Sequence, residues 1–500
     1  MSTTTVETSR VTSAANAGYR TLWRWHFYAG LFVMPFLLVL AITGTLYCFQ
    51  PQIEPLLYPQ RLIVAPQAVP RLPAEALLAH ARSAMPPNAT AVTAVVANDP
   101  RRSAEFVFRL AHGDKQSVYV NPYTGAVLGT LSVERRFMQV DRMLHRKLLL
   151  GKPGELLMEL AACWTLVMIG TGVALWWPRE KTTARNALLP RFALKGRPLW
   201  RNVHAVMGIW LALGALLFVL SGLPWTGSWG KQFKALASAA NLGAPPGAWG
   251  GLPLQSGVPA KGGNGISGPD THAENASNDE HAAHEGHRAH TGNTDSMPGM
   301  VMDDLPLPLT PWAVGNARVP NSGANTGAHP LPLGHVVALA ASLGLTEGYN
   351  IALPASATGV YTVSYFPGDP KDERTLYVDQ YSGAVLKDIR YGDYGAVSKA
   401  VSYGTSLHMG RYFGLANQLL CTAISLGLAA MAVTGCVMWW KRRPQRSLGA
   451  PSRERAAPPM RGWKTGLVLL GIVFPLMGAT LVAVWLADRA MVGRGARRIA

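Results

Sequence analysis

Four histidines in this chain of 500 residues occupy matching positions in two halves of the sequence. His26 and His204 each begin an apolar stretch, whereas His145 and His408 each precede one. Imidazole binds transition metals through a ring nitrogen, and an ionisable group at the edge of an apolar span costs free energy. These side chains therefore either extend to the membrane interface or bind something inside the membrane.

The elements that must position these histidines are membrane spans. The chain is 49% hydrophobic and 15% charged, with a mean hydropathy of +0.12. A hydrocarbon core of ~30 Å takes about 20 helical residues, and apolar stretches of that length lie near 27–49, 156–177, 205–225, 415–440 and 467–487. The first stretch has no small-residue cleavage site, so we expect it to remain as an anchor. The sequence predicts a membrane protein with a multi-span α-helical bundle of four core spans and a fifth.

Basic residues give the orientation of the spans. The N-terminus, the connections 178–203 and 441–464, and the tail together carry the whole net charge of +18. Short basic segments face the cytoplasm, so the long connections 50–155 and 226–414 should face the outer side of the membrane. The basic balance thus indicates topology and no nucleic-acid partner. A fifth span would place the basic tail outside, which leaves the orientation of 467–500 open.

The chain repeats itself at fixed spacings. HFYAG (26–30) returns as HAVMG (204–208), LHRKLLLG (144–151) pairs with LHMGRYFG (407–414), and YVNPYTGAVLG (119–129) pairs with YVDQYSGAVLK (377–387). A hydroxyl–glycine pair follows His26 and His204 after 17 and 18 residues (Thr43-Gly44, Ser221-Gly222), and another follows His145 and His408 after 26 and 27 residues (Thr171-Gly172, Thr434-Gly435). We interpret the chain as a duplicated span–domain–span unit.

Both long connections have the pattern of small α+β domains. Residues 74–85 and 334–343 have helical spacing, and each is followed by β-branched, aromatic-rich segments with a Tyr-Thr-Gly or Tyr-Ser-Gly turn. The sequence therefore predicts two outer α+β domains, and neither contains a recognisable nucleophile–base arrangement.

Topology sorts the four histidines into two pairs. His26 and His204 belong at the cytoplasmic edge, and His145 and His408 at the outer edge. Two imidazoles at each face are what bis-histidine ligation of two haems requires. Gly30 and Gly208 lie one helical turn from their histidines, where a missing side chain leaves room for a flat macrocycle. Interfacial anchoring is the alternative, and Pro153 could break the helix after His145.

These residues resemble a known family. The span–domain–span plan, the LHRKLLLG segment, the TG…LWWPR ending and the YVNPYTGAVLG turn look like the PepSY-associated transmembrane (PepSY-TM) proteins, over about 20–240 and 330–445. That family includes inner-membrane siderophore reductases of the PiuB/FoxB type. The resemblance implies PepSY-like outer domains, b-type haem held by the four histidines, and reduction of a periplasmic ferric-siderophore.

The stretch 243–330 departs from that family pattern. It is rich in Gly, Pro, Asn and Ala and contains a run of histidines and methionines that could bind a metal: His281, His284, His287, His290, Met297, Met300 and Met302. Imidazole with thioether suits copper, whereas imidazole alone suits zinc or nickel, so we expect copper or another divalent metal here. A flexible linker with incidental histidines is the alternative.

A glycine-rich motif and the four cysteines bear on the electron donor and on thiol chemistry. GNGISG (263–268) matches the dinucleotide pattern literally, but neither a strand before it nor a helix after it is predicted. The electron donor should therefore be a quinol or a partner protein. All four cysteines lie in apolar spans, where we expect buried structural thiols.

The sequence thus predicts a haem-containing oxidoreductase that carries electrons across the lipid bilayer to a ferric-siderophore or another chelated metal. A cupric reductase or copper-uptake factor is a second possibility, and a non-catalytic sensor or binding module a third. We expect a cytoplasmic N-terminus (1–25), a first span (26–49), a first outer domain (50–140), an outer histidine segment with the second span (141–177), a cytoplasmic loop (178–203), a third span (204–225), a second outer domain (226–400) with the insert 243–330, an outer histidine segment with the fourth span (401–440), a cytoplasmic loop (441–464), a fifth span (465–487) and a tail (488–500).

Overall fold

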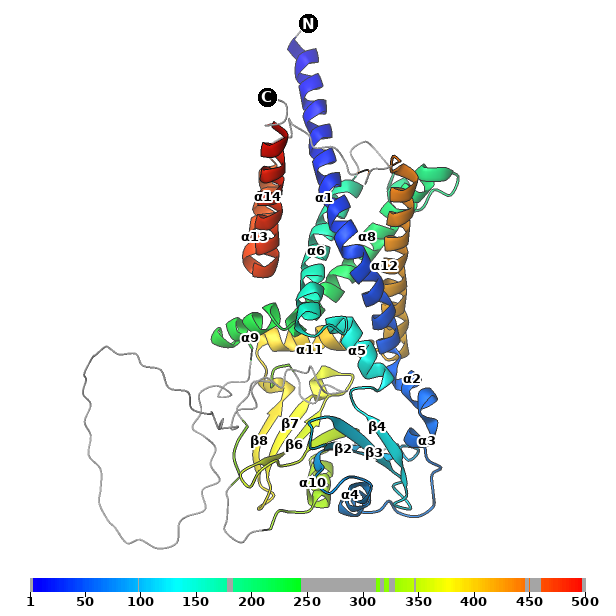
Figure 1. Ribbon diagram of the computed structural model, residues 1–500, viewed down its shortest axis with the longest axis vertical. Helices are drawn as coiled ribbons and strands as arrows, with labels where there is room; N and C mark the ends of the chain where they lie inside the picture. Colours follow the sequence, from blue (N-terminus) through cyan, green and yellow to red (C-terminus); the bar gives the residue numbers. More distant parts are fainter. Residues whose placement is uncertain are drawn as a thin grey trace, which may run out of the picture.

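The computed structural model has a bundle of long helices at one end and a β-sheet domain at the other (Figure 1). The structure describes residues 3–97, 99–177, 183–243, 312–314, 319–322, 329–345, 348–445, 449 and 460–496. Both chain termini lie at the end of the bundle away from the sheet. We call this end the loop side, and the end that faces the sheet domain the sheet side.

Four helices of the described residues are long and apolar enough to cross a membrane. They are α1 (Thr3–Cys48), α6 (Lys152–Trp176), α8 (Gly196–Gly222) and α12 (Leu415–Arg442). Helix α1 packs against α6 and α12, and α8 packs against the same two helices. The first half of the chain (α1 and α6) therefore contacts the second half (α8 and α12) along two sides of the bundle.

Short helices lie across the sheet side of the bundle (Figure 1). Helices α5 (Phe137–Lys147) and α11 (Ala396–His408) carry one predicted ligand each. Backbone with positive φ ends both helices, at Leu148 (φ 53°) after α5 and at Gly410 (φ 71°) after α11. The helix break expected between His145 and Pro153 is therefore present. The remaining short elements are α2 (Gln50–Leu57), α3 (Pro59–Leu62), α7 (Ala184–Leu188), η1 (Leu223–Trp225), α9 (Trp229–Ala239), η2 (Pro370–Asp372) and η3 (Tyr391–Asp393).

All eight strands of the described residues form one antiparallel sheet in the order β4-β3-β2-β1-β5-β6-β7-β8. The strands are β1 (Thr90–Val96), β2 (Ala104–Arg109), β3 (Lys115–Val120), β4 (Val127–Ser132), β5 (Tyr349–Ala352), β6 (Val360–Tyr365), β7 (Arg374–Asp379) and β8 (Val385–Arg390). Helices α4 (Ala74–Ser83) and α10 (Leu333–Ser342) pack on each other and share one hydrophobic core with both sets of strands. The two expected α+β segments thus do not stand apart, because β1 pairs with β5 and joins them.

The C-terminal segment differs from the single fifth span expected over 465–487. It forms two helices, α13 (Arg461–Val473) and α14 (Pro475–Ala496), which pack against each other. Proline disfavours helical backbone in the residue before it, which explains the break at Phe474. Thirteen residues of α13 span only about 20 Å, less than a ~30 Å core, and α13 and α14 together form a helical hairpin. The end of α14 returns to the loop side (Figure 1).

Tryptophans from both halves of the chain attach this hairpin to the bundle. Trp164 Nε1 donates to Thr480 Oγ1 at 3.2 Å, and Trp229 Nε1 donates to the Val473 carbonyl at 2.7 Å. Trp463 of α13 packs edge-on against Trp25, which neighbours His26. The hairpin therefore covers the side of the bundle formed by α1 and α6.

Candidate functional site

Two histidines from different halves of the chain meet near the loop side. His26 lies on α1 and His204 on α8. Their ring centroids are 6.4 Å apart, and the ring planes are inclined at 84°. The structure therefore brings together the two histidines that the sequence placed at the same membrane edge.

A second pair repeats this geometry at the sheet side. His145 of α5 and His408 of α11 have ring centroids 6.4 Å apart and ring planes inclined at 83°. The Phe218 ring lies 4.9 Å from the His408 ring and covers part of the site. Both pairs combine one histidine from each half, so the sites lie at the contact between the halves.

Each imidazole contacts a hydroxyl from the other span of its own half. Four contacts of the same kind join His26 Nδ1 to Thr171 Oγ1 (3.0 Å), His145 Nδ1 to Thr43 Oγ1 (2.8 Å), His204 Nδ1 to Thr434 Oγ1 (2.8 Å) and His408 Nδ1 to Ser221 Oγ (2.8 Å). Within a half, the first histidine contacts the second span, and the second histidine contacts the first span. The halves thus orient their histidines separately and in the same manner.

The hydroxyl groups determine which ring nitrogen carries the proton. Thr43 donates its hydrogen to the Val39 carbonyl at 2.6 Å, and Thr171 donates to the Val167 carbonyl at 2.7 Å. Ser221 and Thr434 likewise donate to carbonyls of their own helices. A hydroxyl has one hydrogen, so its oxygen can only accept from the imidazole. Nδ1 therefore carries the proton in all four histidines, and Nε2 keeps the lone pair that binds a metal.

The glycine after each hydroxyl provides space for the ring. A Cβ added to Gly44 would lie 3.3 Å from His145 Cε1, and one added to Gly172 would lie 3.3 Å from His26 Cε1. The corresponding distances are 3.6 Å from Gly222 to His408 Cε1 and 3.7 Å from Gly435 to His204 Cε1. The repeated hydroxyl–glycine pairs were visible in the sequence, but their contact with the histidines was not predicted. The number of residues between histidine and hydroxyl is the same in both halves of the chain, and this repetition was the signal that could have identified the contacts.

Gly30 and Gly208, expected to leave room for a macrocycle, lie against methionines of the second span of each half. A Cβ at Gly30 would be 4.0 Å from Met168 Sδ, and one at Gly208 would be 3.2 Å from Met431 Cε. Both glycines thus permit close packing between the spans that carry a histidine and its hydroxyl partner.

Burial keeps the sheet-side imidazoles neutral. Burial, together with the neighbouring His408 and Arg146, lowers the pKa of His145 to about 3. Burial also lowers the pKa of His408 to about 4. A metal ligand must have a free lone pair, so both side chains are in the binding-competent form at neutral pH.

The spacing of each pair fits one metal ion between two imidazoles. A metal–imidazole nitrogen bond of about 2.0 Å and a nitrogen about 1.1 Å from the ring centre place two opposed rings about 6.2 Å apart. The observed distance is 6.4 Å in both pairs. The described residues contain no group of three or more His, Cys, Asp or Glu that could hold a metal ion. Haem iron takes four ligands from the porphyrin, so two imidazoles complete its coordination.

The two pairs lie at different depths of the bundle. His26 and Thr43 mark the two levels on the same helix, since Thr43 contacts His145. Their separation of 17 residues along α1 corresponds to roughly 25 Å at 1.5 Å per residue. This value is close to the ~20 Å expected between two sites set just inside the faces of a ~30 Å core.

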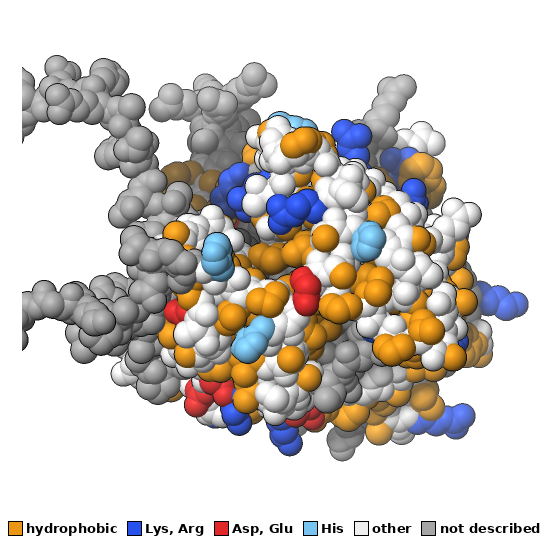
Figure 2. All heavy atoms as spheres, turned by 90° about the horizontal axis from the view of Figure 1, so that it is seen from below, with side chains coloured by type: hydrophobic (Ala, Val, Ile, Leu, Met, Phe, Trp, Pro, Cys, Tyr) orange, Lys and Arg blue, Asp and Glu red, His pale blue; other side chains and the backbone are white. Residues whose placement is uncertain are grey.

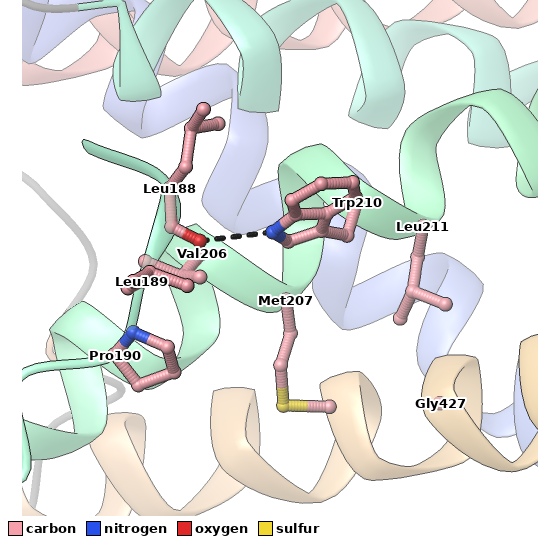
Figure 3. A pocket seen from close by; sticks show the side chains of 8 residues that line it. All are labelled: Leu188, Leu189, Pro190, Val206, Met207, Trp210, Leu211 and Gly427. Carbon is pink, nitrogen blue, oxygen red and sulfur yellow. Dashed lines mark hydrogen bonds between the residues drawn. The ribbon is translucent and has the colours of Figure 1, made fainter. Parts of the chain in front are cut away.

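A shallow apolar groove lies on the outside of α8, beside the loop-side pair (Figure 3). Its volume is about 320 Å³, and it is lined by Leu188, Leu189, Pro190, Val206, Met207, Trp210, Leu211 and Gly427. Trp210 Nε1 donates to the Leu188 carbonyl at 2.9 Å and closes one end (Figure 3). The groove has no ionisable lining, so the candidate chemistry lies at the imidazole pairs.

The far face of the sheet domain carries mixed side chains. Figure 2 shows hydrophobic, basic, acidic and histidine side chains distributed over it, without one sign of charge gathered in a patch. Two histidines outside the membrane pack against turns instead: a Cβ at Gly125 would lie 2.7 Å from His80 Nε2, and one at Gly383 would lie 2.8 Å from His335 Nε2. Both glycines have positive φ (75° and 71°), as the turns require.

The histidine–methionine run expected to bind metal (281–302) lies outside the described residues.

The comparisons with known proteins agree with the resemblance seen in the sequence. The family model of the PepSY-associated TM region matches residues 23–442, which include both imidazole pairs and the whole sheet. The helical hairpin formed by α13 and α14 follows the matched region. No curated protein matches the chain. The chain, a multi-pass membrane protein, belongs to the PepSY-associated transmembrane family.

Proposed function

We propose that this protein is a haem-containing oxidoreductase of the bacterial inner membrane that passes electrons from the loop side to the sheet side. The acceptor we propose is a ferric-siderophore in the periplasm, whose iron is released by reduction. One observation carries the proposal: four imidazoles stand in two pairs, and each is held with Nε2 free to bind a metal.

The residues assigned to each group follow from these contacts. His26 and His204 would hold one haem b, and His145 and His408 would hold the other. A haem with two imidazole ligands supplies a carrier for one electron at a time. Thr171, Thr434, Thr43 and Ser221 orient the imidazoles and keep the proton on Nδ1, which makes Nε2 a better donor.

The distribution of charge supports the orientation in which electrons would leave the cytoplasmic side. The basic connections lie on the loop side, and short basic loops face the cytoplasm. The sheet domain then lies in the periplasm, and the pair His145–His408 is the one nearest to it. A quinol in the bilayer or a partner protein would supply electrons to the pair His26–His204.

Reduction suits release of chelated iron. Ferric iron binds hard oxygen ligands strongly, and ferrous iron binds them less strongly. One electron delivered to a ferric-siderophore at the sheet side yields Fe(II), which a weaker ligand can take. This step uses no nucleophile or general base, in agreement with the outer domains as the sequence describes them.

Copper is a second candidate substrate. The histidine–methionine run between 281 and 302 combines the two side chains that suit copper ions. In that case the insert would capture Cu(II) and the same haem-bearing bundle would reduce it. A non-catalytic sensor or binding module is a third candidate, in which the histidines would be structural.

The test is reduction of defined substrates by single-site variants. Purified protein is reduced with dithionite, freed of excess reductant and mixed without oxygen with a ferric trihydroxamate or with Cu(II)–glycinate. We expect Fe(II), trapped by bipyridyl, from the unchanged protein and at least tenfold less from His145→Ala and His408→Ala. Equal Fe(II) yields from both variants and the unchanged protein would overturn the proposal.

A deletion separates the two substrates. Removal of residues 270–303 should leave Fe(II) formation unchanged. If that deletion abolishes Cu(I) formation while the unchanged protein reduces copper faster than iron, the cupric reductase is the better assignment. If the folded protein binds no haem and reduces neither metal, the non-catalytic sensor or binding module is the assignment that remains.

A further inference from the structure

Two thiols face each other where the halves of the chain meet at the sheet side. Cys48 ends α1, and Cys421 lies in the second turn of α12. The exposed fractions of these residues are 6% and 3%. They come from different halves, and α1 and α12 pack against each other along the bundle. A bond between the two sulfurs would therefore join the halves.

The two sulfurs share their surroundings. Both Cys48 Sγ and Cys421 Sγ lie 3.8 Å from the carbonyl oxygen of His408, so one backbone oxygen contacts both thiols. Cys421 Sγ also lies 3.2 Å from the Leu407 carbonyl. The backbone carbonyl that holds both thiols thus belongs to a proposed haem ligand.

Neighbouring residues fix the two backbones at this spacing. Gln418 Nε2 donates to the Cys48 carbonyl at 2.8 Å, and Asn417 Nδ2 donates to Cys421 Sγ at 3.3 Å. A Cβ added to Gly410 would lie 3.4 Å from Cys48 Sγ, so glycine leaves room for the thiol. The φ of Gly410 is 71°, which also favours glycine.

The other cysteines have no such partner. Cys436 Sγ lies 3.2 Å from Met34 Sδ, a thioether that cannot form a disulfide. Cys163 is fully buried among hydrophobic side chains in the first half of the bundle. These two residues provide matched controls within the same chain.

We propose that Cys48 and Cys421 form a reversible disulfide that links α1 to α12 beside His408. Both S–H bonds break and one S–S bond forms, while two electrons and two protons pass to a disulfide of an exchange partner, which becomes two thiols. An oxidising compartment on the sheet side would favour the closed form.

The link would hold the sheet-side site at its observed spacing. His145 contacts Thr43 of α1, whereas Cys421 contacts the carbonyl of His408. A covalent bond between α1 and α12 would therefore limit how far the two imidazoles can separate. The inference concerns the thiols alone and does not require the proposed electron transfer.

Thiol counting by mass spectrometry tests the proposal on the purified full chain. Diamide is the oxidant, because it is small and takes up two electrons and two protons to become a hydrazine. The protein is then denatured and labelled with N-ethylmaleimide. The chain has four cysteines, so we expect four labels before oxidation, two after it, and a linked peptide that contains Cys48 and Cys421.

Control variants identify the pair. The number of labels on Cys163→Ser should fall from three to one on oxidation. Cys48→Ser should carry three labels both before and after the same treatment. Oxidation should also raise the Tm of the unchanged protein and of Cys163→Ser, but not that of Cys48→Ser. Four labels after oxidation, a link between other cysteines, or a diamide-insensitive Tm would each overturn the proposal.

Discussion

Replacing Thr171 with valine should weaken the loop-side site while leaving its two histidines in place. Valine has nearly the shape of threonine but has no oxygen to accept from His26 Nδ1, a contact of 3.0 Å in the structure. The Met168 carbonyl then remains as an acceptor for His26, and loss of the hydrogen bond to Thr171 costs about 0.5–1.5 kcal/mol. The imidazole also loses the interaction that fixes its tautomer.

That free energy corresponds to a measurable loss of affinity. About 1.4 kcal/mol changes an equilibrium constant tenfold, so roughly 2- to 10-fold weaker binding of haem at this site is expected. The assay is titration of haem into haem-depleted protein, followed by the absorbance of the bis-imidazole complex. Thr171→Ser keeps the hydroxyl and should restore most of the affinity.

Thr165 offers a matched control on the same helix. It is buried on α6 and donates to the Ala161 carbonyl at 2.8 Å, as Thr171 donates to the Val167 carbonyl, but it is not one of the hydroxyls bonded to an imidazole. Thr165→Val should therefore leave haem affinity unchanged. Equal haem affinities in Thr165→Val and Thr171→Val would refute the assignment of Thr171 as the residue that orients His26.

Four further predictions follow from the structure. A Cβ at Gly172 would lie 3.3 Å from its imidazole and one at Gly435 would lie 3.7 Å, so Gly172→Ala should lower haem affinity several-fold in the same titration and Gly435→Ala should not. Burial raises the pKa of Glu373 to about 7 from the usual 4.5. The free energy of unfolding should therefore be highest below pH 4.5 and should fall as the pH rises through 7, because the unfolded chain loses this proton first. Thermal unfolding should show this decline, roughly 3 kcal/mol in total, in the unchanged protein and not in Glu373→Gln. Because α14 returns to the loop side, a C-terminal green fluorescent protein should fluoresce in the cytoplasm, whereas a C-terminal alkaline phosphatase should be inactive. Deletion of 270–303 should abolish Cu(II) binding by the insert, measured by calorimetry, without changing the optical spectrum of the haems.

Much of the bundle could be predicted from the sequence because its signals are local. Apolar length identifies α1, α6, α8 and α12, and the repeat spacing with basic loops sorts the histidines into the two pairs that the structure brings together. The break after His145 was also predictable, since Pro153 and its neighbouring glycines stand in the sequence.

The remaining features depend on packing between distant segments. Thr171 contacts His26 only because α6 folds back along α1, and no local pattern indicates which face of α6 meets the imidazole. The single sheet depends on β1 pairing with β5 of the other half, which the alternation of either strand does not specify. The hairpin has the composition of a span, and Pro475 alone indicates the break.

The optical spectrum of the purified protein tests the central claim most directly. The protein is quantified for haem, and spectra are recorded in the oxidised state and after dithionite reduction, for the unchanged chain and for His26→Ala and His145→Ala. We predict two haems per chain with the split α and β bands of bis-imidazole ligation, and one haem in each variant. A folded but colourless protein, or two haems retained in both variants, would contradict the claim that the imidazole pairs bind haem.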